Sequence, residues 1–311
     1  MVEPKRVISL IASATEIVAA VGRLGWLVGR SHECDHPAGV RVLPSCSVPG
    51  LKTDVPSGEI DRSVKRLLEQ GLSVYKVDAE RLRALEPDVI LTQDQCEVCA
   101  VSLKDLQRAA CDWLDGGVEV VSLRTDCLCD LWRDIGRVAD VLDCTQEGQR
   151  LVMRLQEGMA AVAAKTRPLR SKPRVAGVEW IEPLMASGNW MPELIERAGG
   201  VNLFGETGQH SPGMTWEELC CADPDVLLVS PCGFRVAQTE AEMHQLTAHE
   251  GWHELKAVRE GRVYLADGNA YFHRPGPRLL DSLEMLAEIL HPEAYGQRYP
   301  DTAWKRYAGK T

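Results

Sequence analysis

The chain contains the stretch EPDVILT at residues 86–92 and an echo of it, DPDVLLV, at residues 223–229. In each copy a proline ends the preceding predicted helix, an aspartate fits the turn that follows, and an apolar run comes next. A short apolar run of this kind is typical of a parallel strand that is buried on both faces. The two copies therefore predict one buried parallel strand in each half of the chain.

Two more landmarks recur in the same order, which indicates a weak internal duplication. RVISLI at residues 6–11 is echoed by RVAGVE at 174–179, and GVEVVSL at 117–123 is echoed by GRVYLA at 261–266. Because segments with a helical pattern separate these strands, we expect right-handed βαβ units with a parallel sheet in each half. The expected helices include residues 15–21, 78–85, 191–198 and 216–221.

One long helical segment joins the halves. Residues 146–165 carry a rough apolar stripe and no proline, and a helix of that length spans ~30 Å. The predicted fold class is α/β, with two lobes that are each a parallel sheet flanked by helices, joined by one long backbone helix. The expected domains are an N-terminal lobe at 1–140, a connecting helix at 141–169 and a C-terminal lobe at 170–311. One large doubly wound domain with a surface helix is the alternative.

The first helix is expected to start behind a Ser13 or Thr15 cap, with Glu16 in its first turn.

Composition excludes several classes of protein. The 311 residues carry a formal net charge of −10, which argues against binding to nucleic acid or to anionic lipid. The sequence contains no run of about 18 apolar residues, which is the length needed to span a membrane. Eleven cysteines cannot all pair within the chain, so reduced thiols and a cytoplasmic location are expected. A periplasmic or exported protein whose signal peptide had been removed is the alternative.

Ligands of open parallel sheets bind past the carboxyl ends of the strands, so the loops there hold the candidate binding residues. These loops are rich in aromatic, amide and histidine side chains, which stack on a flat ligand and hydrogen-bond its rim. Polar loops over an aromatic core would look similar. The candidates for ligand binding are His36, Gln95, Glu179, Trp180, Asn189, Trp190, Asn269, Tyr271, Phe272 and Arg274.

A metal site is the less favoured interpretation of the cysteines. Cys96 and Cys99 have ligand spacing, and Cys34 with His32 or His36 would complete a tetrahedral set for zinc or iron. No second CxxC pair exists, and Cys127-x-Cys129 is spaced too closely for the usual knuckle. We expect no bound metal and no cofactor. Reduced Cys34, Cys96 and Cys99 are expected to lie close together, and a Cys96–Cys99 redox pair is a further alternative.

The sequence gives little support for catalysis. It contains no nucleophile elbow, P-loop, dinucleotide-binding glycine motif or HExxH metal motif. Asp94 with Glu97, and Cys34 with His36, resemble catalytic pairs in composition only. We therefore expect a binding protein with no catalytic residues.

Four blocks of sequence together resemble one known family. They are VISLIASATEIVAAVG followed by LVGRSHECDHP, then RLRALEPDVILTQ, MPELIERAGGVNLFGE and YFHRPGPRLLDSLEMLAEILHP, within residues 5–293. These blocks are similar to the helix-hinged substrate-binding proteins of ABC importers, which capture cobalamin, haem and ferric siderophores. The resemblance is strongest to the cobalamin-binding members. It implies two lobes with a ligand between them, and a membrane subunit of an importer as partner.

The resemblance also implies residue roles and a ligand. Glu59 and Glu206 match positions near the acids that dock on importer arginines, and a cobalamin-like corrinoid is the expected ligand. The aromatic and amide-rich loops suit such a wide ligand better than a sugar, an amino acid or a free metal ion. His36 or His273 would supply a cobalt ligand. The alternatives are a haem or siderophore binder, a cytosolic corrinoid-binding or salvage protein, and a metal-handling protein or enzyme with a Cys/His site.

Overall fold

The computed structural model describes residues 3–70, 72–94, 101–107 and 117–309, and the chain divides into two compact units. The N-terminal unit comprises Met1–Val55, Glu59–Thr125 and Cys129–Arg154. The C-terminal unit comprises Pro56–Gly58, Asp126–Leu128 and Leu155–Thr311.

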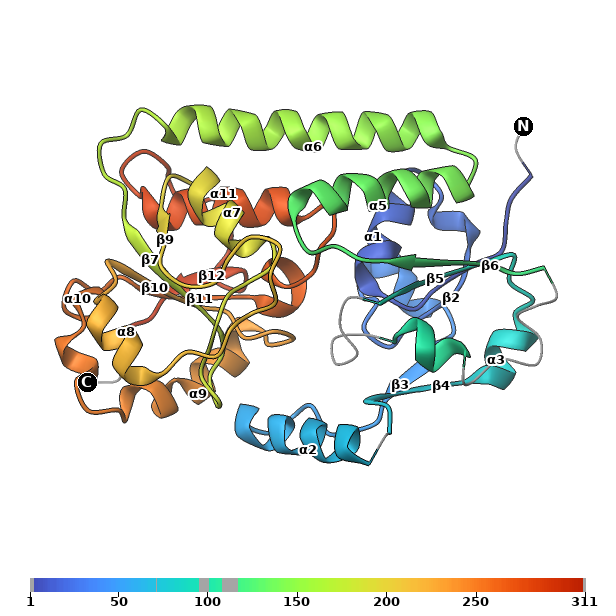
Figure 1. Ribbon diagram of the computed structural model, residues 1–311. Coiled ribbons are helices and arrows are strands. Elements are labelled where there is room, and N and C mark those ends of the chain that lie inside the picture. Colours follow the sequence, from blue (N-terminus) through green and yellow to red (C-terminus); the bar gives the residue numbers. More distant parts are fainter. Residues whose placement is uncertain (1–2, 71, 95–100, 108–116, 310–311) are drawn as a thin grey trace. The chain divides into compact units, whose positions relative to one another are not determined.

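The N-terminal unit is built on a parallel sheet with the strand order β2-β1-β5-β6 (Figure 1). Ile8 and Ile90 sit side by side on its two central strands and are fully buried, as the apolar pattern predicts. A separate antiparallel ribbon pairs β3 with β4. The strands are β1 (Val7–Ser9), β2 (Leu27–Arg30), β3 (Ser47–Pro49), β4 (Tyr75–Val77), β5 (Val89–Gln93) and β6 (Glu119–Leu123).

Helices alternate with these strands along the chain. They are α1 (Ala12–Ala20), α2 (Ser57–Glu69), α3 (Ala79–Ala84), α5 (Leu128–Val141) and the short 3₁₀ turns η1 (Leu24–Trp26) and η2 (Ala38–Val42). The first helix begins earlier than expected. Its N-cap is Ile11, which has no side-chain cap bond, while Ser13 and Thr15 lie buried inside the helix. The predicted cap is therefore wrong, because α1 starts almost directly after β1 and leaves no room for a capping turn.

The C-terminal unit holds a sheet of order β12-β11-β10-β7-β8, with β9 pairing β7 (Figure 1). The central strands are parallel, whereas β8 and β12 pair antiparallel to their neighbours. Leu227 and Val229 of the central strand are fully buried in its core. The strands are β7 (Arg174–Trp180), β8 (Met185–Ala186), β9 (Val201–Asn202), β10 (Val226–Val229), β11 (Val263–Ala266) and β12 (Trp304–Arg306).

The helices of the C-terminal unit are mostly those that the sequence predicts. The predicted helix at 191–198 ends before Gly199, which has a left-handed φ of 85° and so suits a glycine. The helical segments are α7 (Met191–Arg197), α8 (Trp216–Ala222), α9 (Val236–Thr247), η3 (Trp252–Glu254), α10 (Lys256–Arg259), the π-helical η4 (Gly268–Phe272) and α11 (Leu279–Leu290).

The predicted duplication is visible in the strand pairing. In the N-terminal unit β1 pairs β5, and β5 pairs β6, all in parallel. In the C-terminal unit β7 pairs β10, and β10 pairs β11, again in parallel. The three pairs of sequence echoes thus occupy equivalent strands of the two sheets. The prediction of an α/β fold with a parallel sheet in each lobe is confirmed.

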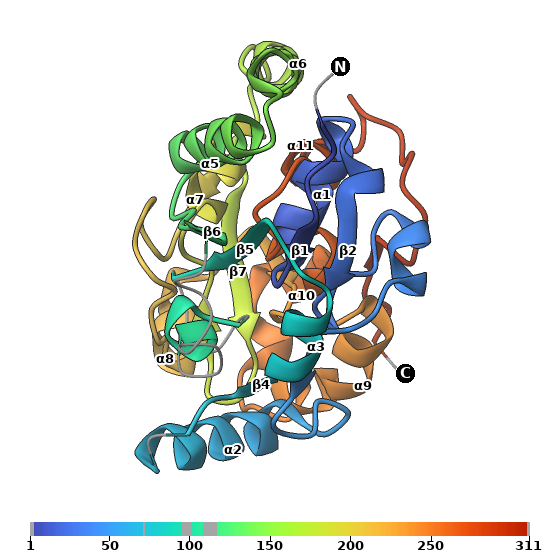
Figure 2. The same ribbon diagram turned by 90° about the vertical axis from the view of Figure 1, so that its right-hand side faces the viewer.

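A single helix, α6 (Thr145–Thr166), carries the chain from one unit to the other and runs for 22 residues. Viewed end-on in Figure 2 it shows as one ring. Two glycines allow it to pack closely. A Cβ at Gly148 would overlap Ala139 of α5, and one at Gly158 would lie 2.7 Å from Leu280 of α11. Each unit therefore packs closely against its own end of the helix. The predicted helix at 146–165 is confirmed.

Among the described residues, no helix is both long and apolar enough to cross a membrane.

Candidate functional site

Three strand ends of the C-terminal unit meet at one histidine. Glu179 lies near the end of β7, Ser230 directly follows β10, and His273 follows the segment after β11. His273 Nδ1 lies 3.5 Å from Glu179 Oε2, and its Nε2 lies 3.4 Å from Ser230 Oγ. The predicted convergence of loops at the carboxyl edge of this sheet is therefore present.

Ser230, His273 and Glu179 have the composition of a hydrolase triad, but their burial argues against catalysis. Ser230 is fully buried and the His273 side chain is 5% exposed, so no substrate reaches the hydroxyl. Both distances are also long for the hydrogen bonds that such a mechanism needs. The group instead ties the three strand ends together.

Two aromatic side chains near this edge remain partly exposed. The Trp180 ring packs edge-on against Phe234 with centroids 5.5 Å apart, and its Nε1 donates to the Glu182 carbonyl at 2.9 Å. Tyr271 lies under the Arg278 guanidinium, which is 5.0 Å from the ring centroid. Both rings are half-buried and held in fixed orientations. They are the predicted aromatic residues that a ligand would be able to touch.

Two other predicted ligand-binding residues belong to the core. Phe272 is fully buried and Trp190 is 4% exposed, and Trp190 Nε1 donates to the Phe272 carbonyl at 2.9 Å. Neither side chain presents a surface to a ligand here. The sequence could not separate Trp190 from Trp180, because both lie near a strand end and differ only in the tertiary contacts that bury Trp190.

The predicted amides and Arg274 serve partly to shape the loops. Asn189 adopts a left-handed φ of 52°, and its backbone bonds to residues 208 and 209 close a turn. The half-buried Asn269 accepts a bond from the buried Arg274, Nη2 to Oδ1, at 3.4 Å. These residues stand at the predicted edge of the sheet, with Asn189 and Asn269 partly exposed.

The start of η4 is pinned against the loop after β10. The Asp267 carboxylate accepts the Ala270 N–H at 2.6 Å, and burial raises the pKa of Asp267. Gly268 approaches the neighbouring loop so closely that a Cβ would lie 2.9 Å from the Ser230 carbonyl oxygen and closer still to that of Pro231. A glycine is therefore required where the loop that carries Asn269 meets its neighbour.

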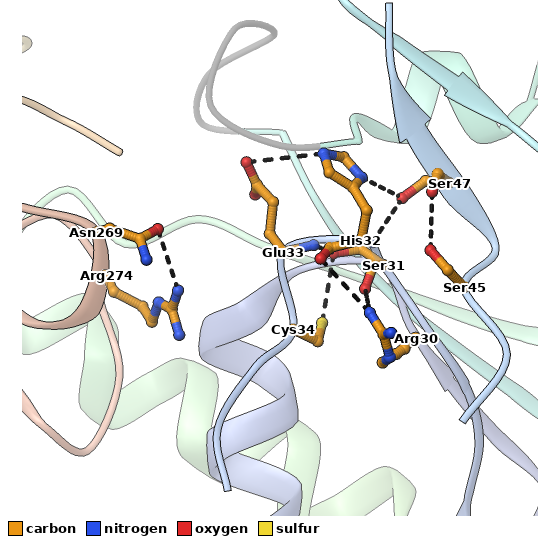
Figure 3. A network of polar contacts seen from close by, with 9 residues as sticks. All are labelled: Arg30, Ser31, His32, Glu33, Cys34, Ser45, Ser47, Asn269 and Arg274. Carbon is orange, nitrogen blue, oxygen red and sulfur yellow. Dashed lines mark hydrogen bonds and ion pairs between the residues drawn. The ribbon is translucent and has the colours of Figure 1, made fainter. Parts of the chain in front are cut away.

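The N-terminal unit has its own polar network at the end of β2 (Figure 3). Arg30 Nη1 donates to the Ser31 carbonyl at 2.8 Å and Nη2 to the Arg41 carbonyl at 3.2 Å. His32 Nδ1 lies 2.9 Å from Ser47 Oγ, and the imidazole ring lies 5.4 Å from the Tyr75 ring. Burial first, and then the Arg30 charge, lowers the pKa of His32 to about 4, so the ring is neutral at pH 7.

Cys34 is placed for packing rather than for metal binding. It is 1% exposed, and its sulfur lies 3.0 Å from Thr15 Oγ1 and 3.4 Å from Ser31 Oγ. Burial raises the pKa of the Cys34 thiol, which disfavours the thiolate that a metal needs. His36 is exposed. Gln95, Cys96 and Cys99 fall outside the described residues, as does their predicted proximity to Cys34.

A second possible metal group is made of Cys127, Cys129 and Asp130. Their ligand atoms lie within 4.8 Å of one another. Both cysteines are, however, disulfide-bonded, and a disulfide sulfur is not a thiolate ligand. Cys127-x-Cys129, whose spacing is too close for the usual metal knuckle, is therefore a pair of oxidised cysteines.

A surface pocket of about 430 Å³ in the C-terminal unit lies away from the carboxyl edge of the sheet. Its walls include Lys172 and Gly199, which precede β7 and β9, so it opens at the amino-terminal edge of the strands. Three of its charged side chains have partners in the lining: Arg197 pairs with Glu193 at 2.8 Å, and Lys172 Nζ donates to the Thr166 carbonyl at 3.1 Å. The ligand site is therefore not assigned to this pocket.

The two predicted docking acids are both exposed. Glu59 lies in the first turn of α2, and Glu206 lies in the loop after β9.

Comparison with known proteins identifies the family. The model of the periplasmic binding protein family matches residues 7–270. The chain belongs to this family. An uncharacterized ABC transporter substrate-binding lipoprotein of Bacillus subtilis is 22% identical over 94% of this chain and 82% of its own length. A vitamin B12-binding protein of Vibrio parahaemolyticus is 24% identical over 91% and 88%. The protein is thus a substrate-binding protein of the ABC-importer type, as the sequence resemblance implied.

Solved structures agree on the fold. A periplasmic haem-binding protein from Pseudomonas aeruginosa superposes with a TM-score of 0.74, covers 99% of this chain and 100% of its own, and is 21% identical. At that identity the likeness establishes the two-lobed fold but not the ligand.

The expected cytoplasmic location is wrong. The family consists of periplasmic binding proteins and the Bacillus relative is a lipoprotein, which points to a place outside the cytoplasm. The cysteine argument failed for a physical reason. Three of the free cysteines, Cys34, Cys46 and Cys144, are buried, and a buried thiol is protected in an oxidising compartment; Cys221 is free and exposed. Cys127 and Cys129 are disulfide-bonded, which suits such a compartment.

Proposed function

We propose that this substrate-binding protein captures a corrinoid of the cobalamin type for an ABC importer. The curated relatives that carry a ligand in their name include vitamin B12-binding proteins. The partly exposed Trp180, Tyr271, Asn189 and Asn269 offer flat apolar faces and amide groups at one sheet edge. A corrinoid matches this chemistry, because it combines a wide apolar macrocycle with many peripheral amides.

The observation that carries the proposal is the fixed orientation of Trp180. Its ring is held by Phe234 on one side and by the bond from Nε1 to the Glu182 carbonyl, yet it remains half-exposed. An aromatic ring that is already ordered loses little entropy when a flat ligand stacks on it.

Haem is the second candidate, and a specific feature favours it. The Arg278 guanidinium stacks on the ring of Tyr271 at the same edge of the sheet. A cation beside an aromatic face suits a planar macrocycle with carboxylate side chains, as in haem, better than the neutral amides of a corrinoid.

The test is titration of the purified protein with cyanocobalamin, aquocobalamin, cobinamide and hemin, followed by tryptophan fluorescence. We expect at least one corrinoid to bind more tightly than ~100 µM, roughly 5.5 kcal/mol. Binding of hemin alone would move the assignment to haem. Failure of every corrinoid and of hemin to bind at that level would refute a macrocycle ligand altogether.

We further propose that Glu59 and Glu206 dock on the membrane subunits of the importer. Both are exposed carboxylates, which pair readily with arginines of a partner. Their replacement by Lys should lower transport into vesicles that contain the importer, while ligand affinity stays unchanged. Glu69→Lys, at the far end of α2, is the matched control. Equal transport by the docking variants and the control would exclude this role.

A further inference from the structure

The last turn of α8 carries two adjacent cysteines that are both free. Cys220 is half-buried and Cys221 is exposed, and neither takes part in a disulfide, in contrast to Cys127 and Cys129. Because α8 leads through Pro224 into β10, this turn lies at the amino-terminal edge of the C-terminal sheet. The pair is therefore remote from the strand ends at which the corrinoid is proposed to bind.

An acid stands one turn before both cysteines. Glu217 is three residues before Cys220 and four before Cys221, and residues with these two spacings are neighbours on a helix surface, with Cβ atoms about 5–6 Å apart. One face of α8 thus presents a carboxylate and two thiols. Among the described residues, the side chains of Glu217 and Cys221 make no hydrogen bond or ion pair, so both are available to a ligand.

The helix beneath these side chains is held in place at its start. Thr215 Oγ1 accepts the Glu218 N–H at 3.1 Å, and the Glu218 carboxylate accepts the Thr215 N–H at 2.8 Å. This cap uses Glu218 and leaves Glu217 out. Trp216 Nε1 donates to the Glu250 carbonyl at 2.8 Å, which ties the helix to the neighbouring turn. The backbone that carries the three side chains is therefore ordered before any ligand binds.

The surroundings of the thiols are acidic. Burial raises the pKa of the Cys220 thiol, and the charge of the adjacent Cys221 raises it further. The carboxylates of Glu217 and Glu254 act in the same direction. These negative charges attract a cation, and a cation at the thiols would in turn stabilise the thiolates that bind it.

We propose that Glu217, Cys220 and Cys221 bind one thiophilic divalent cation of the zinc type. Zinc takes four ligands in tetrahedral geometry, and thiolate and carboxylate groups are among the ligands that it prefers. Two sulfurs bound at ~2.3 Å to one tetrahedral ion lie about 3.8 Å apart. The Cα atoms of adjacent residues are also separated by ~3.8 Å, so rotation about the two Cα–Cβ bonds can bring both sulfurs to the ion.

The binding step is an exchange of ligands on the cation. Two metal–sulfur bonds and one metal–oxygen bond to Glu217 form, and the bonds to the displaced waters break. The two thiols release two protons to solvent, no electron is transferred, and one water stays in the fourth position. In an oxidising compartment the bound ion also protects the two adjacent thiols from disulfide exchange. The proposal is independent of the proposed function, since neither depends on the other's residues.

Titration with Cd²⁺ tests the site, because cadmium binds to the same ligands as zinc and its bonds to thiolates absorb in the ultraviolet. The unaltered protein is compared with the Cys220→Ser/Cys221→Ser variant, and the difference removes the contribution of the other cysteines. We expect this variant to bind one cadmium ion fewer. Each single serine variant and Glu217→Gln should bind that ion about tenfold or more weakly. Cys232→Ser and the exposed Glu157→Gln are the matched controls and should bind like the unaltered protein.

Equal cadmium binding by the unaltered protein and the double variant would refute the site. Full binding by either single serine variant would show that the two thiols do not chelate together, and full binding by Glu217→Gln would show that its carboxylate is not a ligand; each result overturns the proposal. X-ray absorption of the unaltered protein with one equivalent of zinc needs no substitution. It should show two sulfurs at ~2.3 Å beside oxygen ligands, and a shell without two sulfurs would contradict the assignment.

Discussion

Gly268 provides the sharpest test of how the C-terminal unit builds its ligand-binding edge. A Cβ placed there would lie 2.8 Å from the Pro231 carbonyl carbon, 2.9 Å from the Ser230 carbonyl oxygen, and closer still to the Pro231 oxygen. All three neighbours are backbone atoms, so no flexible side chain can move aside. The loop after β10 and the η4 segment must separate by several tenths of an ångström or more.

The expected cost of Gly268→Ala follows from that geometry. Overpacking a well-packed site typically lowers the free energy of unfolding by about 1–3 kcal/mol. Because the clashes here are with backbone atoms at a rigid strand end, we expect a loss of about 3 kcal/mol. For a unit of this size that corresponds to a fall of roughly 6–12 °C in the melting temperature. Ligand affinity should fall as well, because the displaced segment carries Asn269 and Tyr271.

The assay is differential scanning calorimetry of both the unaltered protein and the variant, with a parallel ligand titration. Gly213→Ala is the control, since nothing lies within 4 Å of a Cβ there and its φ is not left-handed. It should change stability by less than about 0.5 kcal/mol. If Gly268→Ala melts and binds like the control, the close contact between the two loops does not hold the site together.

Three further changes probe the platform, the buried thiol and a buried histidine. Trp180→Ala should weaken ligand binding by ~1–3 kcal/mol in a fluorescence titration, whereas Trp26→Ala in the N-terminal unit should not; equal affinities would remove Trp180 from the site. The Cys34 thiol should react with Ellman's reagent only after unfolding, because it is buried and its pKa is raised by burial; fast labelling of the native protein would contradict its placement. Burial lowers the pKa of His291, so the unfolded chain takes up a proton there more readily and stability should fall as the pH drops below about 6.5; urea melts should show a weaker fall for His291→Asn and an unchanged fall for the exposed His253→Asn.

Local patterns were enough to predict the strands and the connecting helix. Pro87 and Pro224 stop the preceding helices, and the apolar runs after them reach far enough to form β5 and β10. The absence of proline between residues 146 and 165 likewise permits α6. These strands and this helix depend on residues that are neighbours in the sequence, so local patterns are enough to predict them.

The site depended on contacts that the local sequence does not encode. Trp180 and Trp190 both stand near strand ends, but only Trp190 is buried, with its Nε1 donating to the carbonyl of the distant Phe272. The anchoring of His32 by Ser47 joins residues of two different strand segments, and only the fold brings them together. For the same reason the cysteine count misjudged the location, since burial of Cys34 is invisible in composition.

Hydrogen exchange of the protein with and without saturating cyanocobalamin tests the proposed function most directly, because it reports binding and its place together. We predict added protection in three segments at the carboxyl edges of the sheets, residues 31–36, 179–190 and 267–274, and no change around residues 163–172 beside the amino-terminal pocket. Protection that is absent from all three segments, or that centres on residues 163–172, would contradict the capture of a corrinoid at these strand ends.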